Sequence, residues 1–178
     1  MSTAFRIKDL RVYTIAPDAK AGTYFGPGQS EHWLTDSLIS NPMSGYEKYR
    51  ERRSSWGIGA IGALVVEIET EDGTVGVATG TGGAPAAWMI RHHFARFVVG
   101  QDARNVNLIW DQLYRSSLPY GRKGLPIMAI SCVDLALWDL VGKVRKEPVY
   151  NLIGGLSREE ITFYCTGPRP EAIKALGF

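Results

Sequence analysis

The sequence predicts an α+β domain, with strands first and helices after them, followed by the start of a second β/α unit. Three observations predict this order. A strand pattern near the N-terminus is followed by a hairpin pattern around Asp72-Gly73. Two amphipathic helix patterns come next, and after them a long helix in which almost every side chain is apolar or small.

Composition and charge indicate the class of protein. Of the 178 residues, 45% are hydrophobic and 21% are charged, as is usual for a globular domain. The formal net charge of +2 is too small to argue for nucleic acid or a membrane as a partner. No apolar run approaches the roughly 20 residues that span a bilayer. Because the N-terminus also lacks the pattern of a secretory leader, we expect a cytoplasmic protein that binds neither membranes nor nucleic acid.

Three segments carry strand patterns. Residues 5–15 mix β-branched and aromatic side chains with charges, which favours a first strand. Residues 62–70 alternate, with apolar side chains on one face and acidic ones on the other. The apolar face consists of Leu64, Val66 and Ile68. Because Asp72-Gly73 favours a tight turn, residues 74–79 are expected to complete a hairpin.

Two amphipathic helices are predicted after the hairpin. The first starts near Pro85, since proline is tolerated in a first turn, and ends at Gly100. Its buried stripe is Ile90, Phe94, Phe97 and Val98. The second follows Asn105, the expected N-cap residue. Its apolar positions have the spacing of one helix face and are Val106, Ile109, Trp110, Leu113 and Tyr114. The α+β domain is therefore expected over residues 1–124.

A third helix is predicted over residues 126–144. It is apolar on all sides, which favours burial between two structural units. A short strand over residues 161–165 and a helix starting at Glu171 follow. A parallel strand followed by a helix needs neighbouring strands to bury its faces. We therefore expect residues 125–178 to form a linking helix and the incomplete start of a second unit, in a piece of a longer protein.

Three features invite a chemical interpretation, and each has a plainer one. The loop over residues 80–83 lies between a strand and a helix, as phosphate-binding loops do, but Pro85 stands where a dinucleotide-binding loop has its third glycine. A simple turn is favoured. His92 and His93 are neighbours and point in different directions, which favours rim histidines over a metal site. Cys132 lies in the apolar helix and is interpreted as a core residue rather than a nucleophile.

The segment 46–53 mixes aromatic and basic side chains, which raises nucleic-acid binding as an interpretation. The interspersed Glu47 and Glu51, together with the low net charge, favour a solvated helix face instead. An arginine of this segment could still bind a small acid, because the planar guanidinium pairs with a carboxylate through two parallel hydrogen bonds.

The most specific feature is the run AISCVDLALWDLVGK from Ala129 to Lys143, followed by PVYNLIGG at residues 148–155. This run resembles the signature of the mandelate racemase branch of the enolase superfamily. Further segments resemble the L-rhamnonate dehydratase subfamily, and the similarity extends over nearly the whole chain. These segments are His32-Trp33 with residues 41–44, Arg53 with Trp56-Gly57, residues 64–67, and residues 163–167 with Arg169-Pro170.

The resemblance implies an enolase N-terminal-like capping domain followed by the first β/α unit of a truncated (β/α)7β barrel. It also implies a Mg²⁺-dependent sugar-acid dehydratase, which removes the proton α to the carboxylate and expels the 3-hydroxyl as water to give a 2-keto-3-deoxy acid. In that family the metal ligands and the base lie at the ends of later barrel strands. The resemblance therefore assigns no catalytic residue and no metal ligand to this chain, and the Mg²⁺ ligands are expected beyond residue 178.

The resemblance places the substrate contacts of this chain in loops of the capping domain. Arg53 matches the substrate-contacting arginine of the family, and His32 is a second candidate. Gly26 lies in the region where the family has a substrate-contacting histidine, so L-lyxonate and L-mannonate stay open beside L-rhamnonate. We also expect a homo-oligomer. Two alternatives remain: a truncated, non-catalytic interaction or assembly module, and another reaction of the superfamily such as racemisation or cycloisomerisation.

Overall fold

The computed structural model describes residues 2–15, 42–49, 61–164 and 170–177. The chain divides into two compact units. One consists of Met1–Ala16 and Ile61–Leu156, and the other of Pro17–Ala60 and Ser157–Phe178. The predicted domain boundary between residues 124 and 125 stays a prediction.

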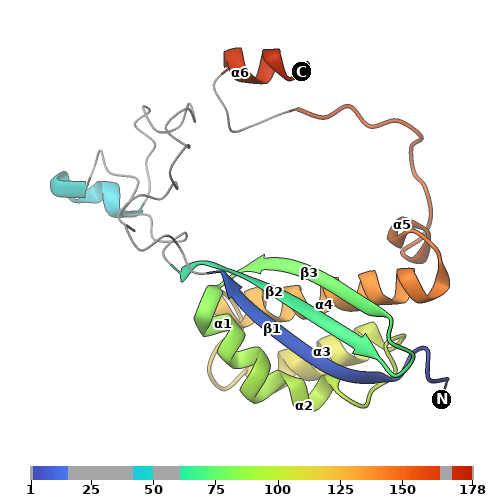
Figure 1. The fold of residues 1–178 in the computed structure, drawn as a ribbon. Coiled ribbons are helices and arrows are strands. Elements are labelled where there is room, and N and C mark those ends of the chain that lie inside the picture. The colour runs from blue at the N-terminus through green and yellow to red at the C-terminus, as the bar shows by residue number, and fades with distance from the viewer. Residues whose placement is uncertain (1, 16–41, 50–60, 165–169, 178) are drawn as a thin grey trace. The chain divides into compact units, whose positions relative to one another are not determined.

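The first unit contains a three-stranded antiparallel sheet in the order β1-β2-β3 (Figure 1). Its strands are β1 (Ile7–Ile15), β2 (Ala63–Thr70) and β3 (Val75–Thr81). The predicted hairpin turn is confirmed, because the Asp72 carboxylate accepts hydrogen bonds from the Thr70 hydroxyl at 2.6 Å and the Thr74 N–H at 3.0 Å. Gly73 has a φ of 89°, a conformation that glycine adopts without strain.

The two faces of the sheet differ in polarity. The predicted apolar face of β2 is confirmed, because Leu64, Val66 and Ile68 are fully buried. The opposite face carries a cross-strand ion-pair network, in which the Arg11 guanidinium contacts Glu67 at 3.1 Å and Glu69 at 2.6 Å. One face of this antiparallel sheet therefore packs against the core while the other meets solvent.

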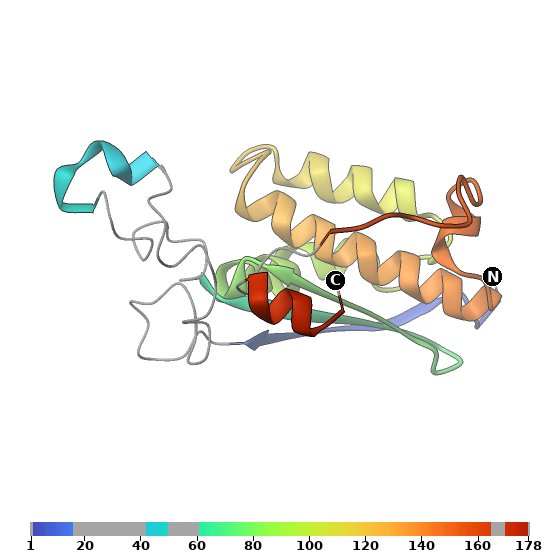
Figure 2. The same cartoon turned by 90° about the horizontal axis from the view of Figure 1, so that it is seen from above.

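Helices cover the apolar face. They are α1 (Gly83–Met89), a π-helix (Ile90–Phe94), α2 (Ala95–Val98), α3 (Val106–Ser117) and α4 (Leu125–Arg145), and the short α5 (Val149–Leu152) follows and contacts α4. Figure 2 shows α3 and α4 side by side, and α4 packs on β3 and β2. The predicted stripe of the first helix is largely confirmed, since Ile90, Phe94 and Val98 are fully buried and Phe97 packs at the edge of the core. Its wide π turn was not predicted, because a single wide turn leaves the flanking apolar pattern in place.

The N-cap predicted at Asn105 is only partly correct. Asn105 is the residue before α3, but its side chain makes no capping hydrogen bond. Its backbone forms the hydrogen bonds of the turn that starts the helix. The Asn105 N–H donates to the Asp102 carbonyl at 3.0 Å, and the Asn105 carbonyl accepts from the Ile109 N–H at 3.0 Å. The helix therefore starts in a backbone turn rather than under a side-chain cap.

The long helix α4 forms the centre of the unit. Its buried residues are Pro126, Ala129, Ile130, Cys132, Val133, Ala136, Leu137, Leu140, Val141 and Gly142. Burial on every side is not observed, since Leu135 is 54% exposed. The 21-residue helix α4 contains an 18-residue stretch with a mean hydropathy of 1.7, so it is long and apolar enough to span a membrane by length and composition. The expectation that no apolar run approaches the length that spans a bilayer is therefore wrong for α4. The helix nevertheless packs against the sheet, as the core helix of a globular domain does.

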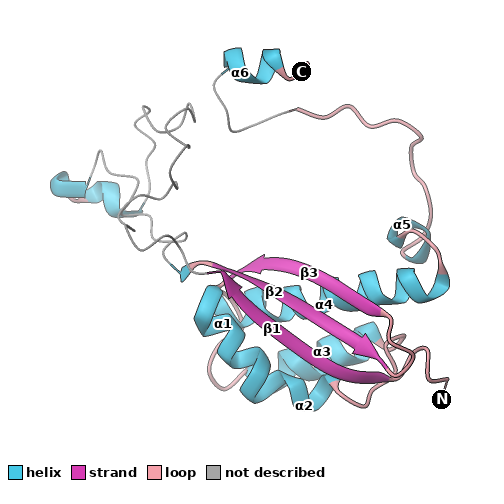
Figure 3. Ribbon diagram, in the orientation of Figure 1, coloured by secondary structure: helices cyan, strands magenta, loops and turns pink. Residues whose placement is uncertain are grey.

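In the second unit the described elements are the 3-10 helices Pro42–Gly45 and Glu47–Tyr49 and the helix α6 (Pro170–Ala175). The strand predicted at residues 161–165 is wrong over its described part. Residues 161–164 form a loop (Figure 3), and Ile161 and Tyr164 are 72% and 85% exposed. A parallel strand needs neighbours to take its hydrogen bonds, and the described part of this unit contains no other strand.

Candidate functional site

The two predicted substrate-contact residues cannot be placed in the structure. Arg53 and His32 lie outside the described residues, as does Gly26, where the family has a histidine. The three arginines of the segment 46–53 lie outside them too, since residues 50–60 are not described. The assignment of Arg53 and His32 as substrate contacts therefore stays a prediction from the resemblance.

Among the described residues, no group of three or more His, Cys, Asp or Glu side chains could hold a metal ion. Three carboxylates, those of Asp9, Glu67 and Glu69, surround Arg11. Hydrogen bonds from Arg11 and Lys8 hold the pKa of Glu69 below its usual value. These carboxylates are thus engaged in ion pairs with Arg11, two of them across strands and one within β1.

The glycine loop over residues 80–83 is a strand-to-helix turn, as the plainer interpretation predicted. Gly82 and Gly83 have φ values of 108° and 43°, in the left-handed region that favours glycine. A Cβ atom on Gly83 would overlap the carbonyl oxygen of Ile61. Both glycines are therefore explained by the path of the backbone from β3 into α1.

The two adjacent histidines have different surroundings. The Nδ1 atom of His93 lies 2.7 Å from the Tyr120 hydroxyl, and this bond links the π-helix to the segment after α3. His92 is exposed, with its ring centroid 5.0 Å from that of Trp88. Burial raises the pKa of Tyr120. The two rings therefore have different neighbours, as predicted for adjacent positions on a helix.

The interpretation of Cys132 as a core residue is confirmed. It is 1% exposed, and its thiol faces the carbonyl of Ala78 in β3 at 3.8 Å. Burial raises the pKa of the Cys132 thiol to about 11. Because the thiolate is the nucleophilic form, a buried thiol of this pKa is inert at neutral pH.

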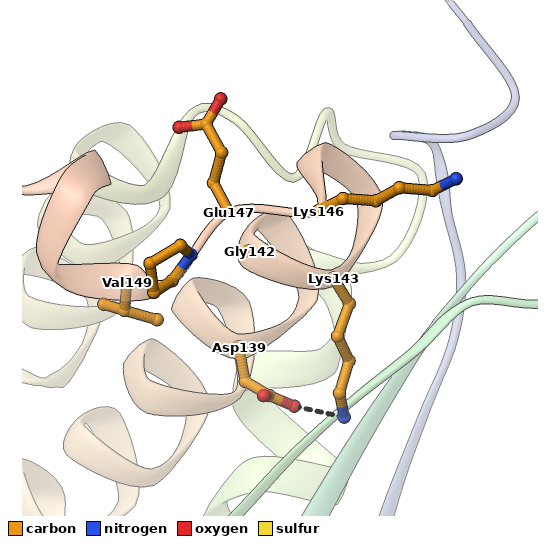
Figure 4. A pocket seen from close by; sticks show the side chains of 7 residues that line it. Asp139, Gly142, Lys143, Lys146, Glu147 and Val149 are labelled. Atoms are coloured by element: carbon orange, nitrogen blue, oxygen red, sulfur yellow. Dashed lines mark ion pairs between the residues drawn. The ribbon is translucent and has the colours of Figure 1, made fainter.

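A surface hollow of about 410 Å³ lies where α4 ends and α5 begins (Figure 4). Its lining residues are Asp139, Gly142, Lys143, Lys146, Glu147, Pro148 and Val149. In Figure 4 the Lys143 side chain points toward Asp139, and their ion pair measures 2.6 Å, while Lys146 and Glu147 extend away. Since the charges that face each other are paired within the protein, the hollow does not converge on a ligand.

Asp139 and Lys143 also bind the backbone of β3. The Asp139 carboxylate accepts the Val77 N–H at 2.7 Å, and the Lys143 ammonium donates to the Val75 carbonyl at 3.0 Å. The sequence did not predict these two contacts, because Asp139 and Lys143 lie within the run at residues 129–143 that was interpreted as a family signature. Its i, i+4 spacing on a helix predicted to be buried is a signal that could have drawn attention to it.

Comparison with known proteins defines the class to which this fold belongs. Residues 57–154, more than half of the chain, match the family model of the mandelate racemase / muconate lactonizing enzyme N-terminal domain. The chain therefore belongs to this family, and the family resemblance predicted from the run at residues 129–155 is confirmed.

The similar proteins narrow the class further. A putative L-rhamnonate dehydratase of Caldivirga maquilingensis is 50% identical over 173 residues, which is 97% of this chain and 42% of that protein. The crystal structure of L-rhamnonate dehydratase from Gibberella zeae matches 98% of this chain at 54% identity with a TM-score of 0.81, and 41% of that chain is covered. The crystal structure of rhamnonate dehydratase from Gibberella zeae in complex with Mg matches 98% of this chain at 55% identity with a TM-score of 0.84, and 43% of that chain is covered. The chain thus spans about two fifths of the length of these relatives.

Proposed function

We propose that this chain is the N-terminal, substrate-capping part of a Mg²⁺-dependent sugar-acid dehydratase that acts on L-rhamnonate or a closely related acid. The observation that carries the proposal is identity of 50% to 55% to rhamnonate dehydratases over 97% to 98% of the chain. The α+β arrangement of the first unit supports it, because relatives with the same arrangement bear that name. A cytoplasmic, homo-oligomeric enzyme of the barrel class is part of the same proposal.

In this reaction the metal ion stabilises the negative charge that develops on the carboxylate when the α-proton leaves. No cluster among the described residues fits Mg²⁺, so we assign the ion to none of the described residues. The contribution of the chain is substrate binding. Arg53 would hold an oxygen of the acid through its planar guanidinium, and His32 would contact the sugar chain. Loops that close over the substrate would also exclude water.

The experiment is turnover by the full-length protein encoded by the complete gene. The product expected from L-rhamnonate, L-lyxonate or L-mannonate is a 2-keto-3-deoxy acid, which reacts with semicarbazide to give an absorbing adduct. We expect Mg²⁺-dependent formation of that product, abolished by EDTA and restored by added Mg²⁺. Racemised acid without loss of water would instead show another reaction of the superfamily, and no product from any of the three acids would refute the proposal.

The non-catalytic alternative makes a different prediction for the 178-residue chain alone. An independent assembly module should be a well-behaved particle that unfolds cooperatively, whereas part of an enzyme exposes apolar surface meant for the rest of the protein. The described structure already shows such surface at Leu135, Ile153 and Leu156, which are 54%, 65% and 60% exposed. This exposure favours the enzyme part over the module.

A further inference from the structure

The outer edge of β3 pairs with no other strand among the described residues. β3 lies at one end of the strand order, and Val77 is opposite Glu67 of β2. Residue pairs in an antiparallel ladder alternate between bonded and non-bonded, and Val77 directs its N–H away from β2 to Asp139. Val75 and Thr79, two residues away on either side, therefore also direct their backbone groups outward. A row of outward N–H and C=O groups is a template for another strand.

Two side chains of α4 occupy the N-terminal half of this row. Asp139 accepts the Val77 N–H at 2.7 Å, Lys143 donates to the Val75 carbonyl at 3.0 Å, and the two side chains are joined by a 2.6 Å ion pair. The i, i+4 spacing places both side chains on one face of the helix. Asp139 thus supplies an acceptor for an N–H, and Lys143 supplies a donor for a C=O. A neighbouring strand would have supplied the same two kinds of partner.

The opposite edge of the sheet is covered in another way. Along β1, the Ile7 N–H donates to the Gln101 carbonyl at 3.0 Å, and the Gly100 N–H donates to the Ile7 carbonyl at 2.8 Å. Farther along, the Arg91 guanidinium donates to the Val12 carbonyl. On the β1 edge backbone therefore covers Ile7 and a side chain covers Val12, whereas on the β3 edge the side chains of Asp139 and Lys143 bind the Val77 and Val75 backbone groups.

We propose that Asp139 and Lys143 are an edge guard: they occupy the backbone groups through which β3 would pair with the β3 strand of a second copy of this chain. Two identical strands can pair antiparallel about a twofold axis, which needs the outward groups of Val75 and Val77 free in both copies. In the unmodified chain Asp139 and Lys143 hold these backbone groups in hydrogen bonds, so the groups are not free to pair with another strand. The inference rests on the fold of the first unit and not on the proposed catalytic function, so each can fail without the other.

Hydrogen exchange tests the guard in the unmodified 178-residue chain. The Val77 amide is bonded to Asp139, while the outward Thr79 amide on the same strand donates to no described residue. We expect Val77 to exchange about tenfold more slowly than Thr79, the effect of one net hydrogen bond. In dilute Asp139→Ala/Lys143→Ala protein, Val77 should exchange at the rate of Thr79. Equal rates at the two amides in the unmodified chain would overturn the proposal.

Sedimentation velocity tests the consequence. The Asp139→Ala/Lys143→Ala variant should show a particle mass that rises at least about twofold with protein concentration, beyond any change in the unmodified chain. The matched control is Asp111→Ala/Arg115→Ala, which removes another i, i+4 ion pair, 2.7 Å long on α3, and should leave the mass unchanged. If the double alanine variant does not fold, Lys143→Met, which frees only the Val75 carbonyl, should show a weaker association in the same direction.

A proline locates the contact. Thr79→Pro, added to the guardless variant, removes an outward N–H of β3, and proline is tolerated on an edge strand. It should abolish the concentration-dependent association. If a folded guardless variant keeps the mass of the unmodified chain, or if its association survives Thr79→Pro, the guard proposal is wrong.

Discussion

The backbone of Gly76 in β3 lies so close to α4 that a Cβ atom on Gly76 would overlap the carbonyl oxygen of Ala136. The same Cβ would lie 2.5 Å from the Cβ of Leu140 and 2.7 Å from its nitrogen. Strand and helix therefore meet with no side chain between them at this point. The guard formed by Asp139 and Lys143 depends on this approach, because it brings the next turn of α4 to the edge of β3.

Gly76→Ala should therefore be costly. The atoms in its way belong mainly to helix backbone, which cannot move aside as a side-chain end can. We expect a loss of about 2–3 kcal/mol in the free energy of unfolding, as for overpacked cores, measured by urea denaturation. Gly80→Ala is the comparison, since its Cβ would meet the Cys132 side chain at 3.1 Å and 3.3 Å. Equal losses in the two variants would show that close backbone approach is not the cause.

We expect Asp102 to make the free energy of unfolding decrease at acidic pH. It is 6% exposed, and Arg104 holds the pKa of its carboxyl below the usual value, chiefly through side-chain hydrogen bonds. A carboxyl whose folded pKa is lowered stabilises the fold fully above its unfolded pKa of about 3.9, and that stability is lost as the pH falls through the lower folded value. Asp102→Asn should accordingly lose less stability than the unmodified chain between pH 6 and pH 3.

The measurement is the urea midpoint across that pH range. Asp111→Asn is the control, because Asp111 is paired with Arg115 at 2.7 Å on the exposed side of α3 and is far less buried. Its acid dependence should stay near that of the unmodified chain. Parallel curves for Asp102→Asn and the unmodified chain would argue that the Asp102–Arg104 contact does not contribute to acid sensitivity.

The Cys132 thiol should report opening of the core. Its pKa of about 11, raised by burial, leaves at pH 8 roughly 200-fold less thiolate than an ordinary cysteine of pKa about 8.5. In a Cys165→Ser background, reaction with a disulfide reagent should be slow in buffer and rapid in urea beyond the unfolding midpoint. Gly76→Ala should speed the reaction in buffer by lowering the cost of opening. Fast labelling of the native, unmodified chain would contradict the burial of Cys132.

The parts of the fold that the sequence predicted are those that depend on nearby residues. The Asp72-Gly73 turn carries its own hydrogen-bond acceptor, and the apolar alternation of β2 follows from its period of two. The missed features depend on partners far along the chain. The pairing that would make residues 161–164 a strand needs a neighbour, and the approach at Gly76 needs α4, which starts some fifty residues later.

In the candidate site, too, the residues interpreted from local sequence agree with the structure, while those that depend on distant partners were not predicted. Cys132, the two histidines and the glycine loop could be judged from local pattern, and the structure agrees with those judgements. Arg53 and His32 came from resemblance alone, since nothing in the spacing of a single sequence shows which loop residue meets a substrate. The edge contacts of Asp139 and Lys143 were hidden because the run that contains them was read only as a family signature.

Arg53 provides the last prediction, made for the full-length enzyme. If its guanidinium holds the acid through charge-assisted hydrogen bonds of about 1.5–3 kcal/mol, Arg53→Ala should lower kcat/KM about 10- to 150-fold. Arg53→Lys keeps the charge but loses the planar fork, so it should recover only part of that loss. Arg115→Ala, which removes an arginine paired with Asp111 on the exposed side of α3, should leave kcat/KM unchanged. Full activity in Arg53→Ala, or full recovery in Arg53→Lys, would show that Arg53 does not bind the substrate through two oriented hydrogen bonds.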